Sequence, residues 1–134
     1  MATVTQSFTV EDMEYVRHGD RSLMLRLFRP VGAGPFPVIV VLHPGGWAHG
    51  DLAGCQVQGE SWAQEGFAVA SPDFRQGAEK YPSSLIDINY AVRWLKSHGA
   101  ELNIDPGRVA LSGISSGGHL AMLSAMRPLD ARYG

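Results

Sequence analysis

The chain has 134 residues, of which 45% are hydrophobic, and its formal net charge is -2. This composition is typical of one globular domain with one core. The charge leaves no basic field for nucleic-acid phosphates, and no apolar run approaches the ~18 residues of a membrane span, so we expect neither partner. Cys55 is the only cysteine, which excludes an internal disulfide and favours the cytoplasm.

The first predicted elements are the two strands of a hairpin. The segments "SFTVEDMEYV" (7–16) and "SLMLRLFRP" (22–30) are separated by "RHGD", and the second alternates leucines with other residues. This alternation predicts a half-exposed antiparallel edge. After a Gly- and Pro-rich turn comes "VIVVL" (38–42), a continuous apolar run that indicates a strand buried on both faces.

Strands and helices then alternate along the chain. Strand patterns return at "FAVASPDF" (67–74) and "RVALSG" (108–113). A weak helix is predicted over 56–66, a stronger one over 81–103 with Gly99 as a stop or kink, and an apolar one over 117–126. This order predicts the α/β class, with parallel strands, right-handed crossovers and an antiparallel N-terminal hairpin.

A serine follows the last predicted strand directly. The segment Gly113-Ile114-Ser115-Ser116-Gly117 fits G-x-S-x-G, in which a sharp strand-to-helix turn exposes the serine oxygen. The bare pattern is common, but its position between a buried strand and a helix makes it informative. We therefore predict that Ser115 is a nucleophile; the alternative is an ordinary helix-capping serine.

The loop after residues 38–42, "HPGGWAHGD", carries two consecutive glycines. Ligands gather at the carboxyl ends of parallel strands, so this loop and the Ser115 turn belong to one predicted site. Gly45 and Gly46 can turn their amides toward one point, where a developing oxyanion would sit. The backbone N–H of Ser116, at the start of the next helix, is the third candidate donor.

In this order the segments resemble the α/β-hydrolases, in particular the esterases similar to hormone-sensitive lipase and their short-acyl and formamidase relatives. "VLHPGGWAHGD" is similar to the family's His-Gly-Gly-Gly oxyanion loop and "SPDFR" to its Asp-Tyr-Arg strand end. Residues 81–121 resemble its helix, Asp-Pro-x-Arg turn and nucleophile elbow. Pro44 replaces the first glycine, which is not the expected donor.

The resemblance implies a three-layer fold with a mainly parallel sheet. It also implies that residues 1–134 are the N-terminal portion of a single α/β-hydrolase domain, truncated after the helix that follows the nucleophile. Ser115 matches the nucleophile, Gly45 and Gly46 match the oxyanion amides, and Asp73 and Asp87 match structural positions. The implied substrate is a small acyl ester.

Other polar residues allow further interpretations. His119 is not expected to be the base, because the elbow points Ser115 away from the helix that follows. His43 and Trp47 are predicted to contact substrate, although His43 could fix the loop backbone and Trp47 could pack under it. We expect no cofactor and no metal, since the spacing of His43, His49, Asp51 and Cys55 matches no zinc site. His18 and His98 are predicted to be surface residues.

A serine hydrolase also needs a base and an acid, which in α/β-hydrolases follow the nucleophile in the order Asp or Glu, then His. Only "MRPLDARYG" remains after the last helix, and it holds Asp130 but no histidine. The catalytic Asp and His are therefore expected outside this chain. The unpaired edge of the strand "VALSG" predicts a C-terminal complementing chain or a homo-oligomer.

The predicted function is hydrolysis of carboxylic esters. Two alternatives remain open: an aryl-formamide hydrolase that uses the same residues on an amide, and a catalytically inactive fragment or ligand-binding homologue. The serine and glycines favour an enzymatic origin, and the missing histidine favours inactivity of this chain alone.

Overall fold

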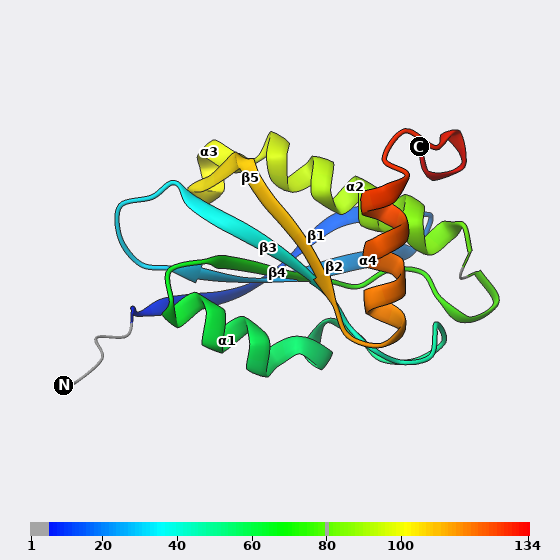
Figure 1. Ribbon diagram of the computed structural model, residues 1–134, viewed down its shortest axis with the longest axis horizontal. Helices are drawn as coiled ribbons and strands as arrows, with labels where there is room; N and C mark the ends of the chain where they lie inside the picture. The colour runs from blue at the N-terminus through cyan, green and yellow to red at the C-terminus, as the bar shows by residue number, and fades with distance from the viewer. Residues whose placement is uncertain (1–5, 80) are drawn as a thin grey trace.

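In the computed structural model, which describes residues 6–79 and 81–134, one five-stranded mixed sheet organises the chain (Figure 1). Its strands are β1 (Phe8–His18), β2 (Arg21–Pro30), β3 (Phe36–Leu42), β4 (Ala68–Pro72) and β5 (Ile104–Gly113). Their order across the sheet is β1-β2-β4-β3-β5. Strand β2 pairs antiparallel with β1 and β4, whereas β3 pairs parallel with β4 and β5.

Helices cover both faces of this sheet. Helix α1 (Gln56–Gln64) lies on one face, and α2 (Ser83–Ser97) and α4 (Ser116–Met126) lie on the other (Figure 1). The short helix α3 (Gly99–Leu102) leads into β5. Single 3-10 turns occupy Leu52–Cys55, Gly77–Glu79 and Ala131–Tyr133. The predicted three-layer α/β fold is therefore confirmed.

The two faces of β2 explain how the core divides. Leu23, Leu25 and Leu27 face the larger cluster beneath α2 and α4, because alternate strand residues point to the same side. Phe28 points the other way, into a smaller cluster beneath α1 that contains Cys55. The hairpin forms an antiparallel edge of the sheet, as predicted, with the largely exposed β1 outermost. Phe28 departs from the predicted alternation, because it is fully buried.

The predicted helix over 81–103 is interrupted in the structure. Helix α2 ends at Ser97, His98 lies between the helices, and α3 ends before Asn103, which adopts the left-handed conformation with φ of 59°. Gly99 marks the break, as predicted, because a Cβ there would lie 3.0 Å from the Ile104 carbonyl oxygen. The chain thus reverses tightly into β5, which begins at Ile104 rather than at the predicted Arg108.

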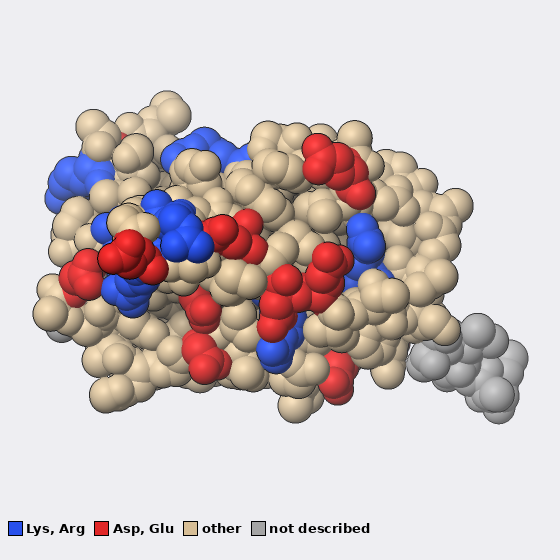
Figure 2. All heavy atoms as spheres, turned by 180° about the vertical axis from the view of Figure 1, so that it is seen from behind, with Lys and Arg blue, Asp and Glu red and all other residues tan. Residues whose placement is uncertain are grey.

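The outer surface carries charges of both signs. On the face seen in Figure 2, acidic and basic side chains are interspersed rather than gathered into one patch of either sign. Two of the ion pairs link Arg17 to Glu14 and Arg26 to Asp12, with N–O distances of 2.9 and 2.8 Å. In the described part of the chain, no helix is both long enough and apolar enough to cross a bilayer.

Candidate active site

The two loops predicted to carry chemistry lie side by side at one end of the sheet. Strands β3 and β5 are parallel neighbours, and Leu42 is paired with Gly113 where both strands end. Just beyond, the Ile114 amide donates to the Leu42 carbonyl over 3.2 Å. The structure therefore brings the Ser115 turn and the Gly45–Gly46 loop to the same sheet end.

Ser115 has a backbone conformation that L-residues rarely adopt. Its φ is 55° and its ψ is -119°, and its side chain makes no capping hydrogen bond to α4. Such a conformation costs about 1–3 kcal/mol for a residue other than glycine and is concentrated at functional sites. The alternative interpretation of Ser115 as a helix cap is wrong, because a cap has an extended backbone and bonds the first turn. Ser115 is instead exposed at the tip of the turn.

The glycines around Ser115 are required by close backbone contacts. A Cβ on Gly113 would lie 2.3 Å from the carbonyl carbon of Gly117. A Cβ on Gly117 would lie 2.1 Å from the carbonyl oxygen of Leu42. Helix α4 can therefore start against the end of β3 only if both positions lack side chains, which explains the G-x-S-x-G pattern physically.

The loop after β3 is a tight turn that leaves amides free. The amides of Ala48 and His49 both donate to the Gly45 carbonyl, over 3.1 and 3.0 Å. Gly45 has a φ of 145°, and a Cβ on it would lie 1.9 Å from the His49 carbonyl oxygen. Gly46 follows with a φ of 62°. Only glycine fits at Gly45, so this loop shape depends on the sequence pattern.

Several backbone N–H groups at this sheet end have no acceptor within residues 6–79 and 81–134. They include those of Gly45, Gly46 and Ser116, the predicted oxyanion donors, and also those of Trp47 and Ser115. The Ser116 amide also lies at the start of α4, where the helix dipole favours negative charge. Such unpaired amides are what an anion-binding site requires.

His43 is buried beneath the loop that carries Gly45 and Gly46. It is 1% exposed, its ring stacks on Phe74 at a centroid distance of 4.5 Å, and its Nδ1 lies 2.8 Å from the Pro44 carbonyl oxygen. These contacts agree with the interpretation that His43 fixes the loop backbone. Its Nε2 is buried and has no partner in the described chain. Contact between His43 and substrate remains a prediction.

Trp47 joins the loop after β3 to helix α4. Its indole N–H donates to His119 Nδ1 over 3.3 Å, and the two rings meet edge to face at 5.6 Å. His119 is thereby turned toward Trp47, and no imidazole nitrogen in the described ranges is hydrogen-bonded to Ser115. The sequence did not indicate this contact, which joins residues 72 positions apart.

The two aspartates matched to structural positions do have such roles. Asp73 Oδ1 accepts the Leu52 amide over 2.7 Å and so fixes the chain beyond the oxyanion loop to the end of β4. Burial is the main cause that raises the pKa of this carboxyl above its ordinary value. Asp87 is 1% exposed and binds both the side chain and the amide of Arg75.

His18 lies at the surface with its side chain 32% exposed, but it also makes a contact that the sequence did not indicate. His18 Nε2 lies 2.9 Å from Asp87 Oδ1, so the end of β1 is attached to α2. His98 is partly exposed, and its ring stacks on Trp94 at a centroid distance of 4.2 Å. Across the described residues, no group of three or more His, Cys, Asp or Glu side chains is arranged to hold a metal ion.

The sequence of this chain is similar to those of known esterases. Residues 26–132 match the model of the BD-FAE family. The carboxylesterase NlhH of Mycobacterium tuberculosis is 36% identical over 103 residues, which are 75% of this chain and 32% of that protein. Lipase 2 of a Moraxella species is 38% identical over 100 residues, 71% of this chain and 23% of that lipase.

The fold comparison agrees with the sequence comparison. A bacterial heroin esterase superposes with a TM-score of 0.80 at 31% identity, covering 91% of this chain and 41% of that structure. The chain spans about a quarter to a third of the length of the curated relatives it matches first. The chain belongs to the BD-FAE family and shares the α/β-hydrolase fold of the esterases to which it is similar.

Proposed function

We propose that this chain carries the nucleophile and oxyanion hole of a carboxylesterase that acts on small acyl esters. The observation that carries the proposal is the left-handed backbone of Ser115, exposed at the start of α4 beside three unpaired amides. The names of the relatives, a carboxylesterase, a lipase and a heroin esterase, support the ester class.

The chemistry assigns one role to each group. Ser115 Oγ attacks the ester carbonyl carbon while a base takes the hydroxyl proton. Negative charge develops on the carbonyl oxygen, where the amides of Gly45, Gly46 and Ser116 can donate to it. The tetrahedral intermediate then collapses: its C–O bond to the alcohol breaks, the base returns the proton to that leaving oxygen, and the alcohol departs from the acyl group left on Ser115. Water, deprotonated by the same base, then attacks the acyl carbon, and Ser115 regains its proton as the carboxylic acid leaves. The catalytic Asp and His are supplied by polypeptide outside residues 1–134.

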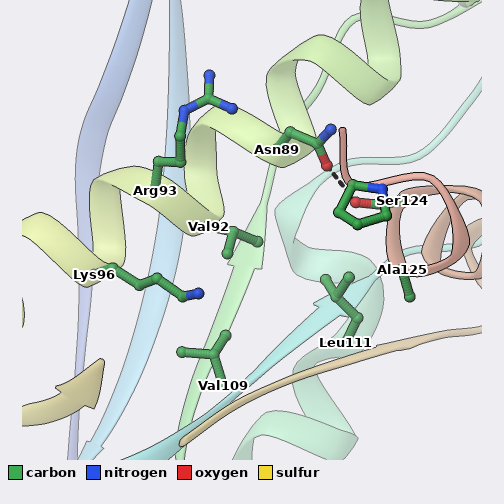
Figure 3. Close-up of a pocket in the computed structure, with 9 residues that line it drawn as sticks. Asn89, Val92, Arg93, Lys96, Val109, Leu111, Ser124 and Ala125 are labelled. Atoms are coloured by element: carbon green, nitrogen blue, oxygen red, sulfur yellow. Dashed lines mark hydrogen bonds between the residues drawn. The ribbon is translucent and has the colours of Figure 1, made fainter. Parts of the chain in front are cut away.

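The free edge of β5 is the proposed docking site for that polypeptide. In the described chain β5 pairs only with β3, so its outer backbone groups are available to another strand. A groove of about 280 Å³ lies beside it between α2 and α4 (Figure 3). Val92, Val109 and Leu111 point into this groove, and Lys96 and Arg93 lie at its rim.

A second groove, of about 300 Å³, lies on the opposite face of the same edge. Ile39, Phe67 and Ala110 contribute to its lining. Because side chains of an added strand alternate between the two faces, both grooves could be filled at once. This arrangement supports strand addition.

The charges at the rim favour an unlike chain over a second copy. Among the described residues, no carboxylate lies within 4.0 Å of Arg93 or Lys96. Pairing β5 with the β5 of another copy would bring these cations to one seam, where like charges repel. A complementing chain with acidic side chains on this face fits better.

We propose that this protein is located in the cytoplasm, because its one cysteine, Cys55, is free and such a thiol suits a reducing compartment.

A ligand-binding homologue without turnover is the second candidate. It is favoured by one observation, that none of the described imidazoles is hydrogen-bonded to Ser115. The aryl-formamide alternative would use the same serine and amides on a different bond. These candidates differ in whether an acyl group is transferred to Ser115, and from which substrate.

Acyl transfer can be measured by intact mass spectrometry after an acid quench. The chain is incubated with 4-nitrophenyl acetate, and separately with formanilide, in buffer containing imidazole to act as the base. We expect one acetyl group per chain from the ester, absent in Ser115→Ala and retained in Ser97→Ala, an exposed serine elsewhere. A formyl adduct from formanilide alone would favour the amide alternative. Equal acetylation of Ser115→Ala would contradict the proposal.

A further inference from the structure

A pair of consecutive residues just after β4 is hydrogen-bonded to the loop after β3. The Gly77 amide donates to the Trp47 carbonyl oxygen over 2.8 Å, and the Gln76 side-chain amide donates to the Gly50 carbonyl oxygen over 2.8 Å. Both ends of the turn that follows Gly46 are therefore held from one place. The proposed chemistry gives neither Gln76 nor Gly77 a role.

The segment that carries this pair is itself anchored. The Arg75 amide donates to Asp87 Oδ2 over 2.8 Å, and the Arg75 guanidinium bonds the same carboxylate. Phe74 is 3% exposed and stacks on the ring of His43. Gly77 has a φ of 70°, a conformation that glycine adopts without strain. The pair therefore contacts the loop from a segment that is fixed to α2.

One chain of hydrogen bonds leads from Gly77 to the Gly46 amide. The peptide group that joins Trp47 to Ala48 accepts from Gly77 through its carbonyl, and its N–H donates to the Gly45 carbonyl over 3.1 Å. The peptide group that joins Gly45 to Gly46 is trans. Because a trans peptide is planar, its N–H points away from its carbonyl. The Gly46 N–H is thereby directed away from the turn, and it has no acceptor among the described residues.

A second set of contacts leads from Gln76 to the Gly45 amide. Gln76 holds the carbonyl of Gly50. Gly50 lies so close to the start of the loop that a Cβ on it would be 2.6 Å from the Pro44 carbonyl oxygen. That carbonyl belongs to the peptide group whose N–H is that of Gly45. A shift of Gly50 therefore turns the Gly45 N–H as well.

The direction of these two amides decides how well they can stabilise an oxyanion. Donors are effective only when they are already aimed at the place where the charge develops, and removal of one donor typically slows acyl transfer by about 10²- to 10³-fold. Hydrogen bonds in series also polarise one another, which strengthens the donor at the end of the chain. Contacts that hold the loop from behind therefore affect the rate although they lie outside the site.

We propose that Gln76 and Gly77 are positioning residues of the oxyanion hole. They hold the loop after β3 and so aim the amides of Gly45 and Gly46 at the oxygen of the ester carbonyl. Neither Gln76 nor Gly77 touches the substrate in this assignment. The inference rests on the proposed esterase function, which supplies the oxyanion, but the aim of the two amides can be measured without any acyl transfer.

Variants of Gln76 test the side-chain contact. Gln76→Met keeps the length of the side chain and its neutrality but has no donor for the Gly50 carbonyl, whereas Gln76→Lys supplies a donor again. We expect acetylation of Ser115 by 4-nitrophenyl acetate in imidazole buffer to slow about 3- to 10-fold in Gln76→Met, the range of one hydrogen bond. Gln76→Lys should recover most of that loss at about 0.5 M salt, where distant charge effects are screened. Gln64→Met, the same change at an exposed position at the end of α1, should leave the rate unchanged.

The backbone contact is tested by removing a single N–H group. Glycolic acid in place of Gly77 converts the amide to an ester and deletes only the donor to Trp47. We expect this chain also to be acetylated about 3- to 10-fold more slowly. The same replacement at Gly107 deletes a 2.8 Å hydrogen bond to Asp105 Oδ1 near the opposite end of β5, and it should leave the rate unchanged. Urea unfolding verifies that each chain is folded.

Amide resonances provide a readout that a loss of stability alone does not move. In the ¹⁵N-labelled chain with Ser115→Ala, which cannot be acetylated at that position, we expect Gln76→Met to shift the Gly45 resonance. Glycolic acid in place of Gly77 should shift the Gly46 resonance, because the chain of hydrogen bonds that polarises this N–H is then broken.

Unchanged acetylation rates in both altered chains would overturn the proposal, and so would Gly45 and Gly46 resonances that move in neither. The esterase proposal fails in a different way. If the parent chain is never acetylated on Ser115 while both resonances still shift, the esterase and the catalytic use of the two amides are contradicted. Their positioning by Gln76 and Gly77 is then still supported.

Discussion

Ser115 is the residue at which local structure and chemistry conflict. Its φ of 55° places a serine where glycine is far less strained. Neighbouring contacts impose this conformation, because Gly113 and Gly117 bring the start of α4 against the end of β3. A residue chosen for stability alone at this position would be glycine.

This conflict predicts that Ser115→Gly is more stable than Ser115→Ala by about 1 kcal/mol, because glycine relieves the strain and alanine keeps it. Both variants should lose the acyl adduct. Urea unfolding followed by circular dichroism measures the difference in the free energy of unfolding. Equal stability of the two variants would show that the Ser115 backbone is not strained.

Single residues were predictable where their role is local. The glycines at positions 45, 113 and 117 could be read from the sequence, because backbone crowding within a few residues requires them. The partners of His18 and Trp47 could not be read, since Asp87 and His119 lie 69 and 72 positions away and only the folded chain joins them.

Among the secondary-structure elements, one buried carboxylate connects three separate segments. Asp87 on α2 accepts hydrogen bonds from Arg75, just after β4, and lies 2.9 Å from the His18 ring nitrogen at the end of β1. A buried charge of this kind is retained only with such partners. Asp87 therefore fixes the first hairpin to the helix that covers it.

Asp87→Asn should lower the free energy of unfolding by about 3 kcal/mol, because it leaves the Arg75 guanidinium, 17% exposed, without its countercharge. Thermal and urea unfolding provide the measurement. Asp20→Asn, the same change at an exposed turn position, is the control and should shift stability by less than about 0.5 kcal/mol. A similar small loss for Asp87→Asn would contradict the connecting role.

Element types were predicted better than element ends. The hairpin, the buried strands and helices α1, α2 and α4 follow from apolar periodicity, which is a property of each segment. The break at His98 and the early start of β5 depend on the tight contact between Gly99 and Ile104. The burial of Phe28 depends on where α1 packs, so the strand pattern alone gave the wrong exposure.

At the scale of the whole molecule, the described sheet has one candidate site at its strand ends and two open edges, β1 and β5. The ends of β3 and β5 hold the candidate nucleophile and oxyanion donors, while the outer side of β5 has no neighbour in the described chain. The sequence predicted both features, because element order determines which strand ends meet. A base for Ser115 and a neighbour for β5 stay predictions, because among the described residues no imidazole is hydrogen-bonded to Ser115 and β5 pairs only with β3.

We propose that Ser115 acts as a nucleophile beside an oxyanion hole. The most direct test is intact and peptide-level mass spectrometry of the purified chain, with any associated polypeptide, before and after a fluorophosphonate. Imidazole is added where no second polypeptide is present. We expect one phosphonyl group, located on Ser115 and absent in Ser115→Ala. A chain that takes up no label with a base supplied, or takes it up equally after Ser115→Ala, would contradict it.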